Sequence, residues 1–254
     1  MQVYKAPLND MKFLFKDFLY DGGFDIIFQN SDFEFSDLDL ILDQAARFCE
    51  EELLPINQTG DGEGCSYERG QVITPTGFKE AYGKYVSNGW QSATLDKRYG
   101  GSGLPYVLGV FLDEMMSSSN MSFGNFPGLT TNAFAAIEKS ASEELKDLYL
   151  PKLATGEWSG TMNLTEPQCG TDLGLTRTMA LPQDDGSYNI TGTKIFITGG
   201  EHDLSENIIH LVLAKTPGAP KGIKGISLFL VPKIIPYPDG SLDKKNDVEC
   251  GSIE

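Results

Sequence analysis

The chain has 254 residues, of which 40% are hydrophobic and 22% are charged, proportions typical of a globular protein and not of a disordered chain. Acidic residues outnumber basic ones by 36 to 20, which gives a net charge of −16. This charge argues against nucleic acid or an anionic membrane surface as the main partner, because both bind a cationic face.

Targeting and metal signals are missing from the sequence. No apolar run reaches the roughly 18 residues of a membrane span, and the N-terminus interleaves Lys5, Asp10 and Lys12 with its hydrophobic residues, unlike a signal peptide. We therefore predict a cytoplasmic protein. Four cysteines without a CxxC pair and only two histidines support neither a metal site nor a disulfide framework. Any chemistry is expected to use an organic cofactor or none.

Residues 1–35 are expected to form an extension that packs onto the rest of the protein. A short helix is predicted over 11–19, and further hydrophobic residues follow at 24–28. From Ser36 the spacing of apolar residues becomes helical, with Asp39 three positions later, as in a capping box.

The region up to Gly156 is predicted to be an all-α unit of four to six helices joined by short loops. Pro55 is expected to end the first helix, because proline disrupts a helix interior. The expected helices, loop and glycine-rich turn lie at 36–54 (helix), 57–70 (loop), 76–88 (helix), 96–105 (turn), 106–118 (helix) and 130–156 (helical run).

From Trp158 onward, β-branched and aromatic residues separated by turn residues predict a β unit of four or more strands. The stretch "QDDGSY" (183–188) is expected to form a hairpin turn. The predicted strand-rich segments are 158–165, 187–200, 207–216 and 225–234.

Common catalytic motifs do not account for the chemistry of this chain. The cluster "YGGSGLP" lies between predicted helices, so it does not fit a dinucleotide-binding GxGxxG, and the Gly199–Gly200 pair fits a turn at a strand end. No GxSxG motif or Ser/His/Asp set is visible. Glu166 and Asp172 are separated by a proline and a glycine, so we interpret them as structural.

The stretch "TMNLTEPQCGTDLG" (161–174) is shaped in a way that a plain loop does not require. Pro167 fixes its own φ and keeps Glu166 out of helical conformation, so the strand turns sharply. Gly170 allows a ligand to approach the backbone, and Thr171 offers a hydroxyl. These residues alone leave two alternatives, a tight connection and a site for a ligand that carries or accumulates negative charge.

Three motifs together resemble the acyl-CoA dehydrogenase family. The segment "LPKLATGEWSGTMNLTEPQCGTDLG" is similar to the family's junction of helical domain and first flavin-contacting strand. "ATLDKRYGGSGLP" is similar to a turn of its helical domain, and "YNITGTKIFITGG" is similar to its second flavin-contacting strand. The opening "YKAPLNDMKFLF" resembles the N-terminal extension of larger members, including the methylthiopropionyl-CoA dehydrogenase-like branch.

The resemblance implies an α+β multidomain fold. An N-terminal all-α helical domain (36–157) is followed by an antiparallel β-barrel domain (158–254), which we expect to be truncated, and the family's C-terminal helical bundle is expected to be missing. The resemblance also implies FAD as cofactor, with Thr165 near the N1/O2 edge of the flavin, Phe196 stacked on it and Thr198 near N5. Thr171 is expected near the pyrophosphate or the substrate thioester. The implied FAD contacts are Met162, Asn163, Leu164, Thr165, Gly170, Thr171, Phe196, Ile197 and Thr198.

The reaction implied by the resemblance is that of an oxidoreductase of fatty acid metabolism. A carboxylate takes the α-proton of an acyl-CoA thioester while the β-hydrogen leaves as hydride to flavin N5. In the family this carboxylate lies in the C-terminal domain, so we assign no catalytic base and expect the chain to be inactive alone. The implied partners are acyl-CoA, an electron-transfer flavoprotein and further subunits of a homo-oligomer. A non-catalytic scaffold, half of a split enzyme, and an acyl-CoA oxidase or flavin monooxygenase stay open as alternatives.

Overall fold

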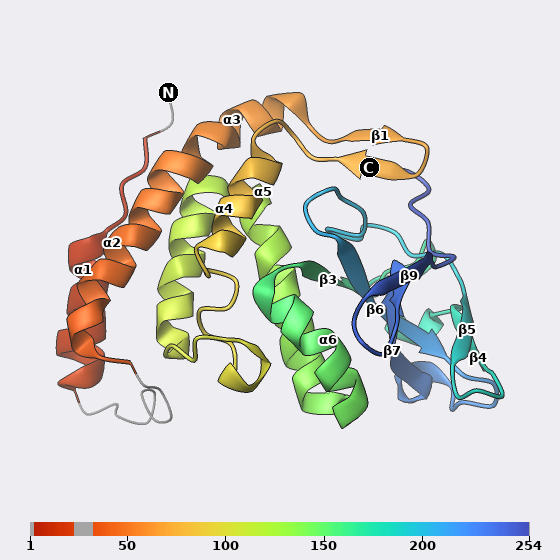
Figure 1. Cartoon of the computed structure of the whole chain (residues 1–254). Coiled ribbons are helices and arrows are strands. Elements are labelled where there is room, and N and C mark those ends of the chain that lie inside the picture. The colour runs from red at the N-terminus through yellow and green to blue at the C-terminus, as the bar shows by residue number, and fades with distance from the viewer. Residues whose placement is uncertain (1–2, 23–32, 254) are drawn as a thin grey trace.

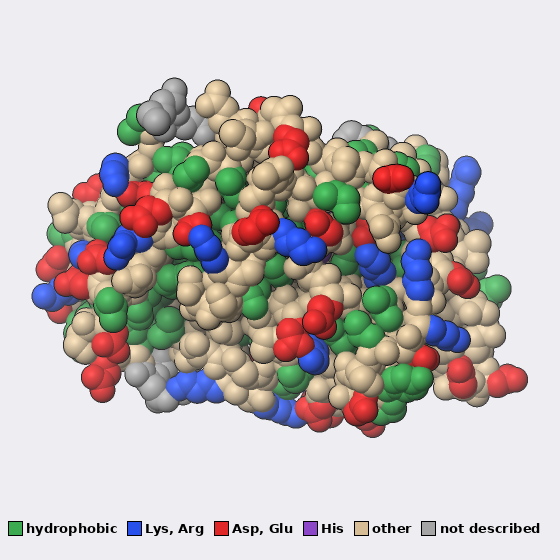
Figure 2. Space-filling model, turned by 45° about the horizontal axis from the view of Figure 1, so that its top comes forward, with side chains coloured by type: hydrophobic (Ala, Val, Ile, Leu, Met, Phe, Trp, Pro, Cys, Tyr) green, Lys and Arg blue, Asp and Glu red, His purple; other side chains and the backbone are tan. Residues whose placement is uncertain are grey.

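The computed structural model describes residues 3–22 and 33–253, which form a group of helices beside a smaller β region (Figure 1). On the face shown in Figure 2, carboxylates and cationic side chains are interspersed. Over the described ranges, no helix has both the length and the apolar character needed to cross a membrane.

The N-terminal segment packs onto the helical part, as predicted. Helix α1 (Leu8–Phe13) continues as a π-helical stretch (Leu14–Tyr20), which together cover the helix expected at 11–19. Met11 and Phe15 are fully buried in the helical core. The hydrophobic residues expected to pack at 24–28 lie outside the described residues.

The predicted capping box at Ser36 is wrong. A 3-10 turn (Phe35–Asp37) leads directly into helix α2 (Leu38–Phe48), and no side chain caps that helix. The hydroxyl of Ser36 instead hydrogen-bonds the carboxylate of Asp37, at 3.5 Å. The chain is therefore already turning before the residue that resembles a cap.

Pro55 does not end the first helix. A π-helical stretch (Cys49–Leu53) joins α2 to helix α3 (Leu54–Glu63), and Pro55 is the second residue of α3, directly after the π-helical stretch. The first half of the predicted loop, residues 57–63, is therefore helix.

A hairpin also interrupts the predicted all-α unit. Strands β1 (Ser66–Glu68) and β2 (Gln71–Ile73) pair in antiparallel fashion. The two turn residues between them, Arg69 and Gly70, both have positive φ, as a two-residue hairpin turn requires.

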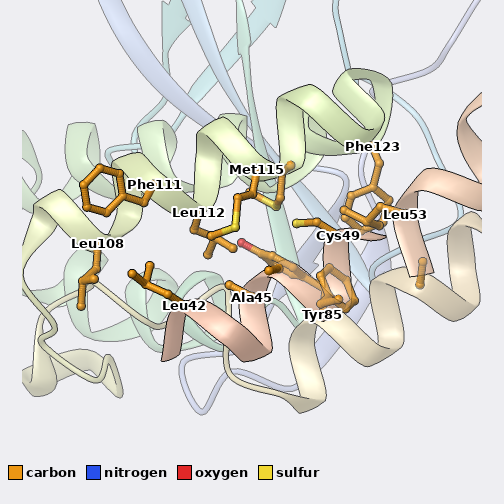
Figure 3. Close-up of a cluster of buried hydrophobic side chains, with 14 of the residues drawn as sticks. Leu42, Ala45, Cys49, Leu53, Tyr85, Leu108, Phe111, Leu112, Met115 and Phe123 are labelled. Atoms are coloured by element: carbon orange, nitrogen blue, oxygen red, sulfur yellow. The ribbon is translucent and has the colours of Figure 1, made fainter. Parts of the chain in front are cut away.

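Three further helices complete the helical part. They are α4 (Phe78–Ser87), α5 (Tyr106–Ser140), kinked at Asn120, and α6 (Glu143–Thr155). Helix α4 lies where predicted, whereas α5 continues past the predicted end at 118 through the segment 119–129, for which no helix was predicted. Helix α6 begins at a Ser142 cap and ends at Gly156, whose φ of 80° favours glycine. The core of this part lies between α2, α4 and α5, and Figure 3 shows Leu42, Ala45, Tyr85 and Met115 pointing toward one another there.

The β part is built around one central strand. Strand β6 (Asn207–Lys215) pairs in parallel with β3 (Trp158–Asn163) on one side and in antiparallel fashion with β7 (Ile226–Pro232) on the other. The pairing is thus mixed and not antiparallel throughout. The remaining strands are β4 (Met179–Pro182), β5 (Tyr188–Thr191), β8 (Ile234–Pro236) and β9 (Leu242–Lys245).

Strand β3 fastens the β part to the helices. A Cβ added at Gly160 would lie only 2.4 Å from the Cβ of Ala133 on α5, and the Gly160 N–H donates to Thr130 Oγ1 at 3.1 Å. Trp158 is 1% exposed and meets Tyr149 of α6 edge to face. The chain that leaves β3, residues 164–174, is therefore held at a fixed place beside the helical part.

Candidate functional site

Two segments far apart in sequence meet at the end of β3. The Ile195 N–H donates to Thr165 O at 2.9 Å, and Lys194 Nζ donates to Leu164 O at 3.0 Å. Further back, Thr161 Oγ1 donates to Thr198 O at 2.6 Å. The structure thus brings together the two groups of residues singled out in the sequence, 162–171 and 196–198.

Glu166 holds this junction together from within. Its side chain is 2% exposed and pairs with Lys194 Nζ at 2.9 Å, which is itself 8% exposed. The carboxylate also accepts from the backbone N–H of Arg177 (2.8 Å) and from both N–H and Oγ1 of Thr178 (3.1 and 2.6 Å). Burial alone would raise the pKa of Glu166, but hydrogen bonds from Thr178, Arg177 and Lys194 hold that pKa at about 2. The carboxylate is saturated with donors, so the structural interpretation of Glu166 is confirmed.

The turn after Glu166 presents a small exposed surface. Glu166 and Cys169 exchange two backbone hydrogen bonds, which close the turn around Pro167. Gly170 and Thr171 follow and are exposed. The Asp172 carboxylate accepts from Gly174 N at 3.0 Å and starts a 3-10 turn, so its role is structural, as predicted.

Neither the backbone conformation nor the packing around residue 170 requires a glycine there. Its φ is not positive, and an added Cβ would lie 3.5 Å from Thr165 Cγ2, an ordinary contact distance. The fold leaves room for a side chain there, so close approach of a ligand to Gly170 stays a prediction.

The second segment is not the strand that its composition predicts. Strand β5 ends at Thr191, and the backbone from 192 to 199 is irregular. Within it Phe196 has a φ of 56°, a left-handed conformation that bulky residues rarely adopt, and its side chain is 72% exposed. A large aromatic ring is therefore held in the open, on a strained backbone, beside Thr165 and its neighbours.

A large groove opens at this place. Its volume is about 2230 Å³, and its walls come from the sheet, from α5 and α6, from the region of the β1–β2 hairpin, from residues 192–201 and from the segment after β9. Of the predicted site residues, those that line it are Asn163, Phe196, Ile197 and Thr198. Met162, Leu164, Thr165, Gly170 and Thr171 lie in the adjoining strand end and turn.

Two buried histidines beside the site were missed by sequence reasoning. His202 accepts at Nδ1 from the Leu204 N–H (3.1 Å), so its Nε2 carries the proton and donates to Ser159 Oγ at 3.0 Å. This histidine cannot take a proton from Ser159, which excludes a Ser–His nucleophile. Burial, with a smaller effect of Lys233, lowers the pKa of His202 to about 4.

The second histidine, His210, is paired on one side only. Its Nδ1 lies 3.2 Å from Asn163 Nδ2, while His210 Nε2 and Asn163 Oδ1 are buried and have no hydrogen-bond partner among the described residues. Burial likewise lowers the pKa of His210 to about 4, so the ring is neutral at pH 7. No local pattern signals this pair, because its members are 47 positions apart.

Comparisons with known proteins match both the helical part and the β part of the chain. The family model for the N-terminal domain of acyl-CoA dehydrogenase matches residues 36–157, and that for the middle domain matches residues 161–241. The 3-methylmercaptopropionyl-CoA dehydrogenase of Ruegeria pomeroyi is 47% identical over 252 residues, which are 99% of this chain and 43% of that protein.

Solved structures share the fold. The butyryl-CoA dehydrogenase of Megasphaera elsdenii has a TM-score of 0.63 and 28% identity, over 79% of this chain and 49% of that one. The acyl-CoA dehydrogenase of Bacillus anthracis complexed with FAD has a TM-score of 0.63 and 27% identity, over 80% of this chain and 31% of that one. The chain spans less than half the length of the curated relatives that match it along nearly its whole length.

Proposed function

Because the chain belongs to the acyl-CoA dehydrogenase family, we propose that it supplies one wall of the FAD site of an enzyme that dehydrogenates an acyl-CoA thioester. The observation that carries the proposal is Phe196. Its ring is 72% exposed on a left-handed backbone, at the point where the segment around Thr198 is tied to the strand end around Thr165. Strained backbone clusters at functional sites, and an exposed aromatic ring offers a flat face against which a planar ligand can stack.

The residues of the junction fit the flavin chemically. A flavin has flat apolar faces and a polar edge of carbonyl and ring nitrogen atoms. Phe196 offers a face, and the hydroxyls of Thr165 and Thr198 offer donors for the edge. We assign FAD binding to the residues that the family motifs mark, namely Met162, Asn163, Leu164, Thr165, Gly170, Thr171, Phe196, Ile197 and Thr198.

When bound, FAD supplies the hydride acceptor of the reaction. The chain's own residues would orient it and shield one face from water, and the hydroxyls of Thr165 and Thr198 would donate to its polar edge. The buried Glu166–Lys194 pair holds the segment around Thr165 and the segment around Phe196 in a fixed relative position.

We assign no proton-abstracting base to the described residues. Glu166 is the buried carboxylate of the motif, but its pKa of about 2 and its five donors leave it neither free nor basic enough to remove an α-proton. We therefore propose that the chain does not turn over alone, and that the base lies in a region corresponding to the part of the relatives that this chain does not span.

Further features of the whole enzyme follow from the family. We propose an extension at 1–35, a helical domain at 36–157 and a β domain at 158–254. We also propose an acyl-CoA substrate, an electron-transfer flavoprotein as acceptor, assembly as a homo-oligomer and a cytoplasmic location. The similarity to the Ruegeria pomeroyi protein supports a thioester with a short acyl chain of that kind.

FAD titration of the purified chain tests the proposal. We expect a change in the visible flavin spectrum, with a Kd on the order of 10–100 µM, because one wall of a site binds weakly. Phe196→Ala should weaken binding about tenfold through loss of the ring contact. Tyr106→Ala is the matched control, since Tyr106 is also 72% exposed but lies on α5, away from the groove.

Two results would contradict the assignment. One is an unchanged flavin spectrum up to about 1 mM FAD, a concentration well above the expected Kd. The other is equal binding by the Phe196→Ala and Tyr106→Ala variants, which would show that the exposed ring does not contact the flavin.

A further inference from the structure

Helix α5 is broken at one residue. Within α5, Asn120 alone has non-helical backbone angles, with a φ of −157° and a ψ of 86°. Proline is a common cause of such a break, but Pro127 lies on the helical backbone after it. The break instead follows three serines at 117–119, and serine and asparagine both favour helix ends over helix interiors. Helix α5 therefore consists of a first half, 106–119, and a second half, 121–140.

The side chain of Asn120 uses both ends of its amide. Its Oδ1 accepts from the Phe123 N–H at 3.0 Å, which is the bond that an N-cap makes to the third residue of a helix. Its Nδ2 donates to Leu53 O at 3.2 Å, at the end of the π-helical stretch that joins α2 to α3. Both partners are backbone groups with a fixed role, so they determine the orientation of the amide. Asn120 therefore starts the second half of α5 and ties that start to a neighbouring helix.

Burial makes a capping oxygen necessary at residue 120. Asn120 is 0% exposed, and its bond with the Phe123 N–H is buried. That N–H belongs to the first turn after the break, where the N–H groups lack an intrahelical acceptor. A buried N–H without a partner is costly. The chain can therefore begin a new helix in the core only because the side chain at the break supplies the acceptor.

The second half of α5 holds the first segment of the proposed FAD site. Thr130 Oγ1 accepts from the Gly160 N–H at 3.1 Å. Ala133 lies one turn further on, and its Cβ is so close to Gly160 that an added Cβ there would be only 2.4 Å away. Both contacts fall on strand β3, which leads into residues 163–165. The place of these residues is therefore set by the second half of α5.

The same half of the helix supports the second segment. An added Cβ at Gly199 would lie 3.5 Å from Phe126 Cδ1 and 3.6 Å from Leu129 Cδ1, so both side chains pack directly against this glycine. Phe126 also meets the ring of His202 edge to face, with 5.1 Å between the centroids. Gly199 follows Thr198 in the chain. The residues from 196 to 199 thus rest on the helix that Asn120 begins.

We propose that Asn120 is a positioning residue of the FAD site. Its amide fixes the start and the direction of the second half of α5, and that half places residues 163–165 and 196–199 relative to each other. The described residues that line the groove do not include Asn120, so it acts through the helix and not by contact with the cofactor. The inference rests on the proposed function, which assigns FAD to these two segments.

Three variants separate the cap from the other contacts of the side chain. Asn120→Ser keeps an oxygen that can cap the Phe123 N–H but loses the bond to Leu53, and Asn120→Ala loses both. Ser119→Ala is the matched control, since Ser119 is also 0% exposed on α5 and its hydroxyl donates to Met116 O at 3.1 Å without capping a helix. Circular dichroism checks that each variant is folded.

FAD titration is the first readout. Asn120→Ala should bind FAD at least about tenfold more weakly than the wild-type chain, whereas Asn120→Ser and Ser119→Ala should stay within about threefold of it. Rescue by serine is the decisive result. If the side chain only filled space or only bonded Leu53, serine and alanine would weaken binding equally.

Hydrogen exchange without FAD is the second readout, so its outcome does not depend on the cofactor. The reporters are the N–H groups of Ile195 and Gly200, which donate to Thr165 O at 2.9 Å and to Ile197 O at 3.2 Å. Asn120→Ala should accelerate their exchange at least about tenfold, and Asn120→Ser should leave it close to that of the wild-type chain. The β4–β5 hairpin of the same sheet is the reference, and its exchange should change less than about twofold.

Several results would overturn the inference. One is reporter exchange in Asn120→Ala that matches the wild-type chain, and another is an equal loss of FAD affinity in the serine and alanine variants. Equal acceleration in the hairpin and in the reporters, or an Asn120→Ala chain that does not fold, would show that Asn120 supports the whole chain and not the site. If the wild-type chain does not bind FAD, the proposed function fails, and the exchange experiment alone decides whether Asn120 positions the two segments.

Discussion

The two segments of the candidate site are built in opposite ways. The first, which continues β3 through Thr165, is fixed by a buried carboxylate with several donors and by packing against α5. The second, around Phe196, has no regular strand pairing, and its aromatic ring is exposed. The second segment is tied to the first at Leu164, Thr165 and Thr161.

The first segment supports the site from below, and the second carries the side chain that is free to contact a ligand. A binding residue is effective when its backbone is held by elements that do not move with the ligand. Here the rigid part is below the surface, in the Glu166–Lys194 pair, and the part that is free to meet a ligand is the ring of Phe196. Changes to the support should therefore cost stability, whereas changes to the contact should cost binding.

Loss of the buried ion pair is expected to have the largest effect. Glu166→Gln leaves the Lys194 ammonium buried without a counter-charge, which should lower the free energy of unfolding by about 3 kcal/mol. Urea unfolding followed by circular dichroism measures it. Asp172→Asn, in the same loop, removes an exposed charge that caps a single turn and should cost less than about 1 kcal/mol. Equal losses for the two variants would show that Glu166 is not the support.

Acid should destabilise the fold through the two buried histidines. The pKa of both His202 and His210 is about 4 in the fold, below the ordinary value of 6.5, so the unfolded chain binds more protons below pH 6.5. Stability is then lost as pH falls from 6.5 toward 4, by about 2 kcal/mol for each histidine at pH 5. The pKa of Glu166, held at about 2 and below its ordinary 4.5, adds a further loss below pH 4.5.

The two histidines serve as controls for each other. Urea unfolding at pH 7 and pH 5 should show about half of the wild-type difference in His202→Gln and in His210→Gln, since each variant retains one buried imidazole. The same pH dependence in a variant as in the wild-type chain would mean that the substituted histidine is not held neutral by the fold.

The contrast between the segments also explains what the sequence could predict. Local signals were sufficient where local forces decide the backbone, as at Gly156, which ends α6, and at Gly186, which turns the β4–β5 hairpin. The prediction that Pro55 ends the first helix was wrong, because the sequence does not distinguish a proline in the first turn of a helix from a proline that ends one.

Long-range contacts were out of reach of such signals. The residues from 192 to 199 have the composition of a strand, but their backbone follows hydrogen bonds to Thr161 and Thr165, more than 25 positions away in the chain. The Asn163–His210 pair likewise exists only after β3 and β6 have paired. The family motifs located the site residues in the sequence, and they carry no information on the conformation of Phe196.

The smallest expected effect on stability concerns that conformation. Glycine adopts a positive φ without strain, so Phe196→Gly should be more stable than Phe196→Ala by about 1 kcal/mol, since alanine keeps the left-handed strain. Both variants remove the ring and should lose FAD affinity equally. Thermal unfolding of the two variants measures the effect of backbone strain on stability, and FAD titration measures the effect of losing the ring on binding. If Phe196→Gly is the less stable variant, the backbone of residue 196 is not strained, and the strain no longer supports a ligand contact at Phe196.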